Sequence, residues 1–245
     1  MPKFFINNNQ IQDDNIILIG EDVKHIKNVL RMKENEEILI CNIDTCENYK
    51  CIISLFENES IKCKILSKES YNTEPNIQIT IFQGLPKAEK MEFIIQKCTE
   101  IGASEFVPVI MNRCIVKIDN KNENKKIDRW QKIAESAAKQ SGRSAIPKVE
   151  NVINFQKLCQ LVEKYDIVLV AYEKEIENTL KNEISKLNKN NLKIGLVIGP
   201  EGGIEEEEVN KLKQTGAKII TLGKRILRTE TASIYLSSIL IYELD

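Results

Sequence analysis

The sequence predicts an α/β protein in which a small β-rich unit precedes a larger unit built on a mostly parallel sheet. Residues 1 to about 70 contain short runs rich in β-branched residues, separated by clusters of Asn, Asp and Glu. Beyond them, continuous apolar runs alternate with amphipathic helical patterns, which is typical of βα units that feed a parallel sheet. Turn and proline residues cluster in SYNTEPN, so we place the domains at residues 1–70 and 71–245.

The first unit should contain five strands and one helix. The helix is expected in EDVKHIKNVLRM, which carries apolar residues at helical spacing. The strands are predicted in FFI, IILI, EEILICNI, YKCIISLFE and SIKCKIL.

The second unit should begin with a strand in IQITIFQGL and a helix in KAEKMEFIIQKCTEIGA. A strand in EFVPVI and a helix over residues 126–140 follow, and Trp130 and Ala134 lie on one face of that helix. Three apolar strands come next, and a final helix over residues 230–242 closes the chain. These strands are DIVLVAY, KIGLVIG and AKIITLG, whose unbroken apolar character predicts burial on both faces of a sheet.

The composition is that of an ordinary soluble protein, with 42% apolar and 29% charged residues in 245. No apolar stretch approaches the roughly 20 residues that span a bilayer, and MPKFFINNNQ lacks the features of a secretory signal. We therefore expect no membrane span and a cytoplasmic location. Seven cysteines include no C-x-x-C pair and His25 is the only histidine, so neither a metal site nor a histidine-dependent nucleophile is expected.

Charge is distributed unevenly along the chain, although the formal net charge is only −1. The segment from Arg113 to Lys148 holds ten Lys and Arg, among them Lys117 and Lys121, against four Asp and Glu. Such a segment is suited to contact phosphates, but a solvated helix and loop surface explains the same charges. The charge run by itself leaves both interpretations open.

Unusual residues gather where the three apolar strands end, at 170–173 (VAYE), 198–204 (IGPEGGI) and 222–233 (LGKRILRTETAS). In open α/β sheets, ligands bind beyond the carboxyl ends of the strands. Glycine lets the backbone approach a ligand and proline stiffens a turn, so GPEGG predicts a preset backbone cradle. The spacing matches neither the P-loop nor the G-x-G-x-x-G dinucleotide motif, which argues against ATP hydrolysis and dinucleotide redox chemistry.

Charged residues after the cradle have different explanations. The acidic run at 205–208 is expected to cap a helix, because acids in a first turn complement the helix dipole. In RILRTETAS, two arginines and a glutamate surround a helix start at which Thr229 is the expected N-cap. A binding site and an ion-paired structural end of the sheet are both open for this stretch.

IGPEGGIEEEEV followed by LGKRILRTETA closely resembles the paired C-terminal motifs of the ribosomal RNA small subunit methyltransferase E family. HIKNVLRM, QGLPKAEKMEFIIQKCTEIGA, NRC, RWQKIAESAAKQSGRSAIPKV and VAYE resemble further blocks of that family in the same order. Three positions depart from its pattern: Ala88-Glu89 replaces Gly-Asp, Cys114 replaces Ser or Thr, and Glu34-Asn35 replaces a Gly-Asp turn.

The resemblance implies a C-terminal trefoil-knotted SPOUT methyltransferase domain and an N-terminal β-rich, PUA-like RNA-binding domain. It implies methylation of N3 of a uridine in 16S ribosomal RNA by S-adenosylmethionine, within the small subunit, by a homodimer without a metal. It also implies the site residues. Cofactor contacts are expected at Ala171, Ile198, Gly199, Gly203, Leu222, Gly223, Ile226 and Leu227. Glu201 or Glu230 is the expected base, with Arg228 stabilising the uracil anion, and Lys27, Arg31, Arg113 and Arg143 are the expected RNA contacts.

Two alternatives remain. One is another SPOUT methyltransferase acting on a ribose 2′-hydroxyl or a tRNA base, although the Asn and Arg motif of the ribose-methylating relatives is not seen in KMEFIIQKCTEIGA. The other is a non-catalytic RNA-binding factor in ribosome assembly, which would need no cofactor cradle. Product analysis after methyl transfer separates these functions.

Overall fold

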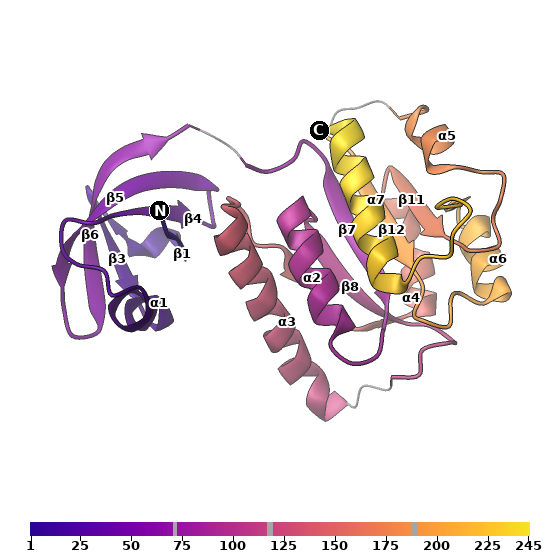
Figure 1. The fold of residues 1–245 in the computed structure, drawn as a ribbon, viewed down its shortest axis with the longest axis horizontal. Coiled ribbons are helices and arrows are strands. Elements are labelled where there is room, and N and C mark those ends of the chain that lie inside the picture. The colour runs from indigo at the N-terminus through magenta and orange to yellow at the C-terminus, as the bar shows by residue number, and fades with distance from the viewer. Residues whose placement is uncertain (71–72, 117–119, 188–190) are drawn as a thin grey trace. The chain divides into compact units, whose positions relative to one another are not determined.

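The computed structural model describes residues 1–70, 73–116, 120–187 and 191–245, without the side chains of residues 120–122. The chain forms two units (Figure 1). The first contains Met1–Glu74 and Ala138–Ile146, and the second contains Pro75–Ala137 and Pro147–Asp245. The division thus falls slightly beyond the predicted residue 70, and the sequence did not indicate that residues 138–146 join the first unit.

The first unit is a curled sheet with strand order β1-β4-β5-β6-β3-β2. All the predicted strands form, and β1 pairs with β4 in parallel while the other neighbours are antiparallel. Along β5, Tyr49, Cys51 and Ile53 are buried because alternate residues of a strand face the same side. The strands are β1 (Lys3–Ile6), β2 (Ile11–Gln12), β3 (Asn15–Ile19), β4 (Glu37–Asn42), β5 (Glu47–Phe56) and β6 (Ser60–Glu69).

The predicted helix of the first unit consists of α1 (Glu21–Lys24) and the π-helical η2 (His25–Leu30), and a 3-10 turn, η1 (Asn8–Gln10), lies upstream. Val23 and Ile26 anchor the helix in the core of this unit. Arg31 ends it in the left-handed conformation, with φ +53°.

The loop after the long helix of the second unit is tied into the first unit by Glu74. Its carboxylate accepts hydrogen bonds from the guanidinium of Arg143 and from the backbone N–H groups of Ser144 and Ala145. Asn48 Nδ2 also donates to Ser144 Oγ (2.8 Å). These polar contacts between residues distant in sequence explain why residues 138–146 belong with the sheet of the first unit.

The second unit is a parallel sheet with strand order β10-β8-β7-β12-β11-β13, and β9 pairs with β8. The predicted apolar strands are all present. The strands are β7 (Gln78–Gly84), β8 (Glu105–Ile110), β9 (Lys148–Val149), β10 (Ile153–Asn154), β11 (Ile167–Ala171), β12 (Lys193–Ile198) and β13 (Lys218–Ile220).

Helices cover both faces of this sheet, so each strand is buried on two sides. Residues of α2, α3, α5 and α7 share one core with the sheet, and residues of α4 and α6 share another (Figure 1). The helices are α2 (Lys90–Ile101), α3 (Asn120–Ser141), α4 (Phe155–Leu161) with η3 (Val162–Lys164), α5 (Leu180–Ile184), α6 (Glu206–Gln214) and α7 (Thr229–Leu244). Helix α3 starts before the predicted residue 126, and α7 extends the predicted helix by a few residues.

Helix α7 is held against the sheet by a stripe of apolar residues one turn apart. Ala232, Leu236, Leu240 and Leu244 are buried at i, i+4 spacing and face the same core as α2. This packing places the first turn of α7 beside the carboxyl end of β12. Within the described parts of the chain, no helix is both long and apolar enough to cross a membrane.

Candidate active site

Three neighbouring parallel strands, β12, β11 and β13, end at the same edge of the sheet, and the loops that follow them line one cavity. The cavity has a volume of about 520 Å³. Its lining comes mainly from residues 171–173, 198–204 and 221–229, which are the stretches singled out in the sequence. All eight predicted cofactor residues line it, namely Ala171, Ile198, Gly199, Gly203, Leu222, Gly223, Ile226 and Leu227.

The GPEGG segment forms a tight turn with no room for a side chain at Gly199. Gly203 N donates to Pro200 O (2.9 Å), and Gly203 has φ +73°. A Cβ on Gly199 would lie 2.9 Å from the carbonyl carbon of Gly203. Gly84, at the end of β7, is equally restricted, because its Cβ would lie 2.6 Å from Pro200 Cδ. The turn is therefore the compact backbone cradle that the sequence predicts.

A buried hydrogen-bond network of Gln83, Thr229 and Ser233 holds the cradle against α7 and β7. Thr229 Oγ1 donates to Gly199 O (2.6 Å), and Gln83 Nε2 donates to Thr229 Oγ1 (2.8 Å). Ser233 Oγ donates to Gln83 Oε1 (2.7 Å). The prediction of Thr229 as N-cap is wrong: Arg228 occupies that position, while Thr229 is the first helical residue and its hydroxyl fastens α7 to the cradle.

Charged side chains from three elements meet at the cavity. Lys90 Nζ lies 2.9 Å from Glu201 Oε1 and 3.8 Å from Glu230 Oε2. Lys87 N also donates to Glu201 Oε1 (3.0 Å). Burial raises the pKa of Glu201, but the hydrogen bonds from Lys90 and Lys87 outweigh it and lower the pKa below its usual value. Of the three predicted catalytic residues, Glu201 and the exposed Arg228 line the cavity, whereas Glu230 is not part of the lining.

Arg113, Asn112 and the acidic run at 205–208 form hydrogen bonds next to the cradle. Arg113 Nη1 donates to Gly202 O (2.9 Å), and Asn112 Nδ2 donates to Glu205 Oε2 (2.8 Å). Glu205 and Glu208 form the capping box of α6, which confirms the predicted capping role of this run. Glu208 is 2% exposed and also accepts from Asn112 N, so it holds the segment 112–114 in place.

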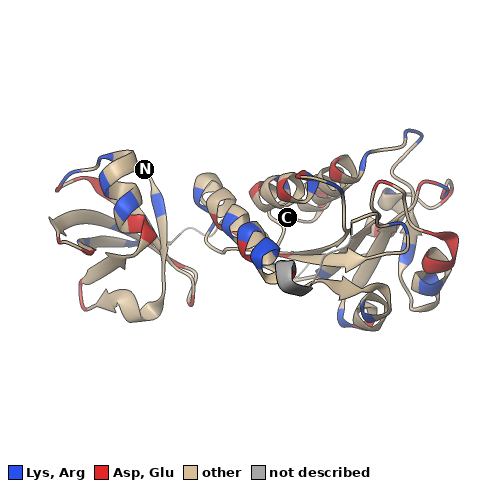
Figure 2. Ribbon diagram, turned by 90° about the horizontal axis from the view of Figure 1, so that it is seen from below, with Lys and Arg blue, Asp and Glu red and all other residues tan. Residues whose placement is uncertain are grey.

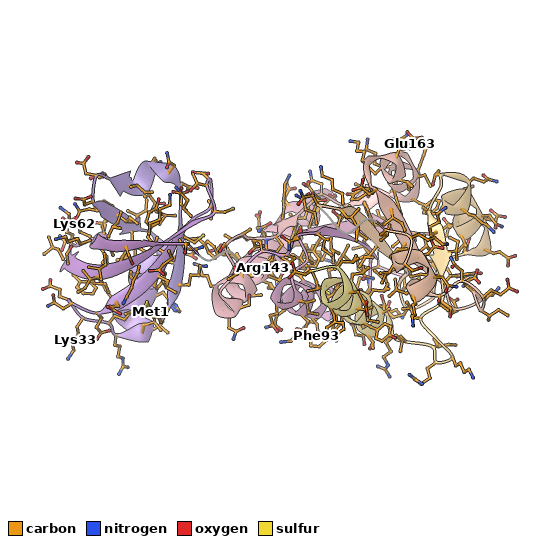
Figure 3. The ribbon with its side chains drawn as sticks, turned by 90° about the horizontal axis from the view of Figure 1, so that it is seen from above. Met1, Lys33, Lys62, Phe93, Arg143 and Glu163 are labelled. Atoms are coloured by element: carbon orange, nitrogen blue, oxygen red, sulfur yellow. The ribbon has the colours of Figure 1, made fainter. Side chains whose placement is uncertain are left out.

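The predicted RNA contacts other than Arg113 lie in the first unit. Arg31 is exposed, and Lys27 Nζ lies 5.8 Å from the centroid of the Phe56 ring and donates to carbonyls of the β5–β6 turn. Arg143, labelled in Figure 3, is only 4% exposed and is paired with Glu74. The expectation of an RNA contact does not hold for Arg143, because its guanidinium is already enclosed and occupied.

The rest of the predicted basic segment is only partly free. Arg129 Nη2 lies 2.8 Å from Glu92 Oε2, and Lys139 Nζ lies 2.8 Å from Asp22 Oδ1. Lys117 and the side chain of Lys121 are outside the described residues. Lys and Arg nevertheless predominate along the visible side of α3 in Figure 2.

Three further residues of the site, Gln83, Lys90 and Glu173, were not predicted from the sequence. Like the predicted residues, they lie at or after the carboxyl ends of parallel strands. Gln83 is the second-to-last residue of β7, Lys90 begins the next helix, α2, and Glu173 follows β11. A Cβ on Gly203 would lie 2.8 Å from Glu173 Oε1, so this carboxylate covers the cradle. The end of β7 lies at the same sheet edge and could have been searched in the same way. Among the described residues, no three His, Cys, Asp or Glu side chains are grouped as metal ligands.

The fold, the cavity at its strand ends and matches to two known families together define an RNA methyltransferase of two domains. Residues 73–241 match the family described as RNA methyltransferase domain, and residues 18–66 match the RNA methyltransferase PUA domain. The second match agrees with the PUA-like unit that the resemblance implied.

Similar proteins identify the family within this class. Ribosomal RNA small subunit methyltransferase E of Bacillus subtilis (strain 168) is 39% identical over 254 residues, which cover 100% of this chain and 98% of that protein. The protein of the same name from Mesomycoplasma hyopneumoniae (strain 232) is 34% identical, over 96% of this chain and 97% of its own. A crystal structure of the Neisseria gonorrhoeae protein of that name, bound to S-adenosyl methionine, has a TM-score of 0.85 at 29% identity, over 98% of this chain and 96% of that one. The chain therefore belongs to the ribosomal RNA small subunit methyltransferase E family.

Proposed function

We propose that this protein transfers a methyl group from S-adenosylmethionine to N3 of a uridine in 16S ribosomal RNA of the small subunit. The observation that carries the proposal is the cavity at the ends of β11, β12 and β13, which is lined by all eight residues predicted to contact the cofactor. Family membership supports the reaction class, and the N. gonorrhoeae relative bound to S-adenosyl methionine supports the cofactor.

The cavity fits the cofactor in size and in the nature of its walls. Its volume of about 520 Å³ falls in the range of roughly 300–1,000 Å³ that is usual for small-molecule sites. The glycines at 199 and 203 carry no side chain, so the backbone of the cradle can approach a ligand closely. We attribute the crowding of three loops at one sheet edge to the trefoil knot of the superfamily. When bound, the cofactor supplies an electrophilic methyl group.

The chain's own residues have three tasks in this reaction. The cradle and its buried network position the reacting atoms, and positioning supplies much of the rate gain of a two-substrate reaction. N3 of uridine carries a proton that has to leave, and Glu201 or Glu230 is suited to accept it. Arg228, exposed at the cavity, is placed to stabilise the negative charge on the uracil ring.

RNA binding is assigned to the PUA-like unit and to the basic residues of the second unit. Lys27 and Arg31 are the candidates in the first unit, and Arg113 is the candidate beside the cradle. Each phosphate contact releases counterions, so affinity for RNA should fall steeply with salt. Replacing Arg31 with Ala should weaken binding and reduce the salt slope by about one.

We also propose that the protein works as a homodimer in the cytoplasm, where its ribosomal substrate is found. Exposed aromatic residues on two adjacent helices of the second unit support an interface there. Phe93 of α2, labelled in Figure 3, is 46% exposed, and Tyr235 and Tyr242 of α7 are 42% and 85% exposed. Sedimentation analysis would show a monomer if this proposal were wrong.

The test is methyl transfer from labelled S-adenosylmethionine to small ribosomal subunits that lack the modification, followed by nucleoside analysis of the RNA. N3-methyluridine is the expected product. A ribose-methylated nucleoside would indicate another reaction of the superfamily. Cofactor binding without transfer to any RNA would favour an assembly factor and refute the proposal.

A further inference from the structure

Lys90 is the cation at the cavity whose position is fixed by two acidic side chains. It starts α2, its side chain is 31% exposed, and it lines the cavity. Its Nζ lies 2.9 Å from Glu201 Oε1 and 3.8 Å from Glu230 Oε2. The three residues come from different elements, and Glu201 is itself anchored by Lys87 N.

Glu230 differs from Glu201 in what it can reach. Its Oε2 atom is buried and accepts no hydrogen bond from any described residue. The separation of 3.8 Å from Lys90 Nζ is too long for a hydrogen bond, so the attraction between them is Coulombic. A buried carboxylate is costly unless a charge compensates it, and Lys90 is the cation found beside it. Glu230 therefore lies near Lys90 but does not line the cavity.

Lys90 keeps donors available for a substrate. An ammonium group has three N–H donors, and one of them is directed to Glu201. Because the side chain lines the cavity, the remaining donors can point toward a bound base. The other charged groups that line the cavity are Glu173, Lys224, Arg225 and Arg228.

We propose that Lys90 is a catalytic residue that stabilises the uracil anion formed at N3, and that Glu230 is a positioning residue acting through Lys90. This inference rests on the proposed function. The negative charge of a uracil that has lost its N3 proton is shared with the two carbonyl oxygens, which are acceptors for an ammonium donor. A preorganised donor aimed at a developing oxyanion is among the strongest contributions an enzyme makes.

The complete step balances with Glu201 as the proton acceptor. The N3 proton passes to the Glu201 carboxylate, and the electron pair of N3 forms the new bond to the methyl carbon. The electrons of the broken carbon–sulfur bond stay on sulfur, which leaves as a neutral thioether. The lowered pKa of Glu201 makes it a weak base, so a cation that stabilises the anion is needed all the more.

The test compares single and double variants of the full chain, acting on unmodified small ribosomal subunits. Lys90→Met should lower kcat by about 100-fold, the usual loss of an oxyanion donor, while the Kd for S-adenosylmethionine stays within about threefold. Lys90→Arg should recover most of the rate, because the charge and the donors remain. Lys90→Gln serves as a second variant that keeps a polar side chain. The control is Lys97→Met on the same helix. Lys97 pairs with Glu100 and does not line the cavity, so this variant should behave as wild type.

A double-variant cycle separates the two roles of Glu230. If Glu230 acts through Lys90, Glu230→Gln lowers kcat in the wild-type background but adds no loss to Lys90→Met. If the two losses multiply, Glu230 acts on the substrate independently and the assignment is wrong. A wild-type kcat in Lys90→Met also overturns it while leaving the proposed function intact. A wild-type protein that methylates no uridine refutes the proposed function and this inference together.

Discussion

Replacing Gly203 with alanine should lower both the stability of the protein and its affinity for the cofactor, for separable reasons. Gly203 has φ +73°, a conformation that costs a residue with a Cβ about 1–2 kcal/mol. For a unit of this size, that loss corresponds to a decrease in Tm of about 2–8 °C. The added Cβ would lie 2.8 Å from Glu173 Oε1, so that carboxylate must also move, at little expense because it is the end of a flexible side chain.

The loss of affinity follows from the position of Gly203 in the cavity. A methyl group there enlarges the cavity wall and displaces the carboxylate of Glu173, which also lines the cavity. We expect the Kd for S-adenosylmethionine, measured by calorimetry, to rise at least about tenfold, which equals 1.4 kcal/mol. Gly216→Ala is the matched control, because Gly216 has φ +96°, nothing within 4 Å of its Cβ, and no part in the cavity. It should lose similar stability but bind normally. Normal binding by Gly203→Ala, or equal weakening by Gly216→Ala, would refute this reasoning.

Three further predictions concern stability. Arg143→Met leaves the carboxylate of Glu74 without its enclosed partner, so the free energy of unfolding in urea should fall by about 3–5 kcal/mol, and a loss below 1 kcal/mol would contradict the pairing. Ala88 has φ +52°, which glycine adopts without strain. Ala88→Gly should therefore either raise stability or lower it by less than about 1 kcal/mol, and a larger loss in thermal unfolding would contradict strain at this position. Burial raises the pKa of Cys98 from 9.0 to about 12, so its contribution to stability is complete below pH 9.0 and is lost as the pH rises toward 12. Urea titrations at increasing pH should show that loss in wild type and a smaller one in Cys98→Ala, and a thiol reagent at about pH 8 should modify exposed Cys46 before Cys98.

Local patterns predicted most of the elements because the chain obeys simple periodicities. Apolar residues at helical spacing fixed α2, whose Met91, Ile94, Ile95 and Cys98 are all buried, and unbroken apolar runs identified the parallel strands. The exceptions lie where a local rule competes with a distant partner. Thr229 has the right chemistry for an N-cap, but the carbonyl of Gly199 takes its hydroxyl instead. Arg143 stands in a basic segment, but Glu74 encloses it.

Local geometry explains two of the three departures from the pattern that the sequence resembles. Ala88 and Asn35 both have positive φ, at +52° and +69°, a conformation that favours glycine. Asparagine tolerates this conformation better than other residues with a Cβ, whereas alanine does so at a cost. The turns are therefore kept while their residues change.

The sequence by itself indicated a β-rich unit followed by βα units, most of their strands and helices, and the residues of the cradle, because periodicity, glycine and proline act over a few residues. It also carried the motifs by which the family is identified. Only the tertiary structure decided which distant residues come together. Lys90 lies within 4 Å of both Glu201 and Glu230, Arg113 donates a hydrogen bond to the carbonyl of Gly202, and residues 138–146 belong to the first unit. The physical reason is that pairing and burial depend on distances between atoms that the fold brings together from far apart in the chain, and no local pattern encodes those distances.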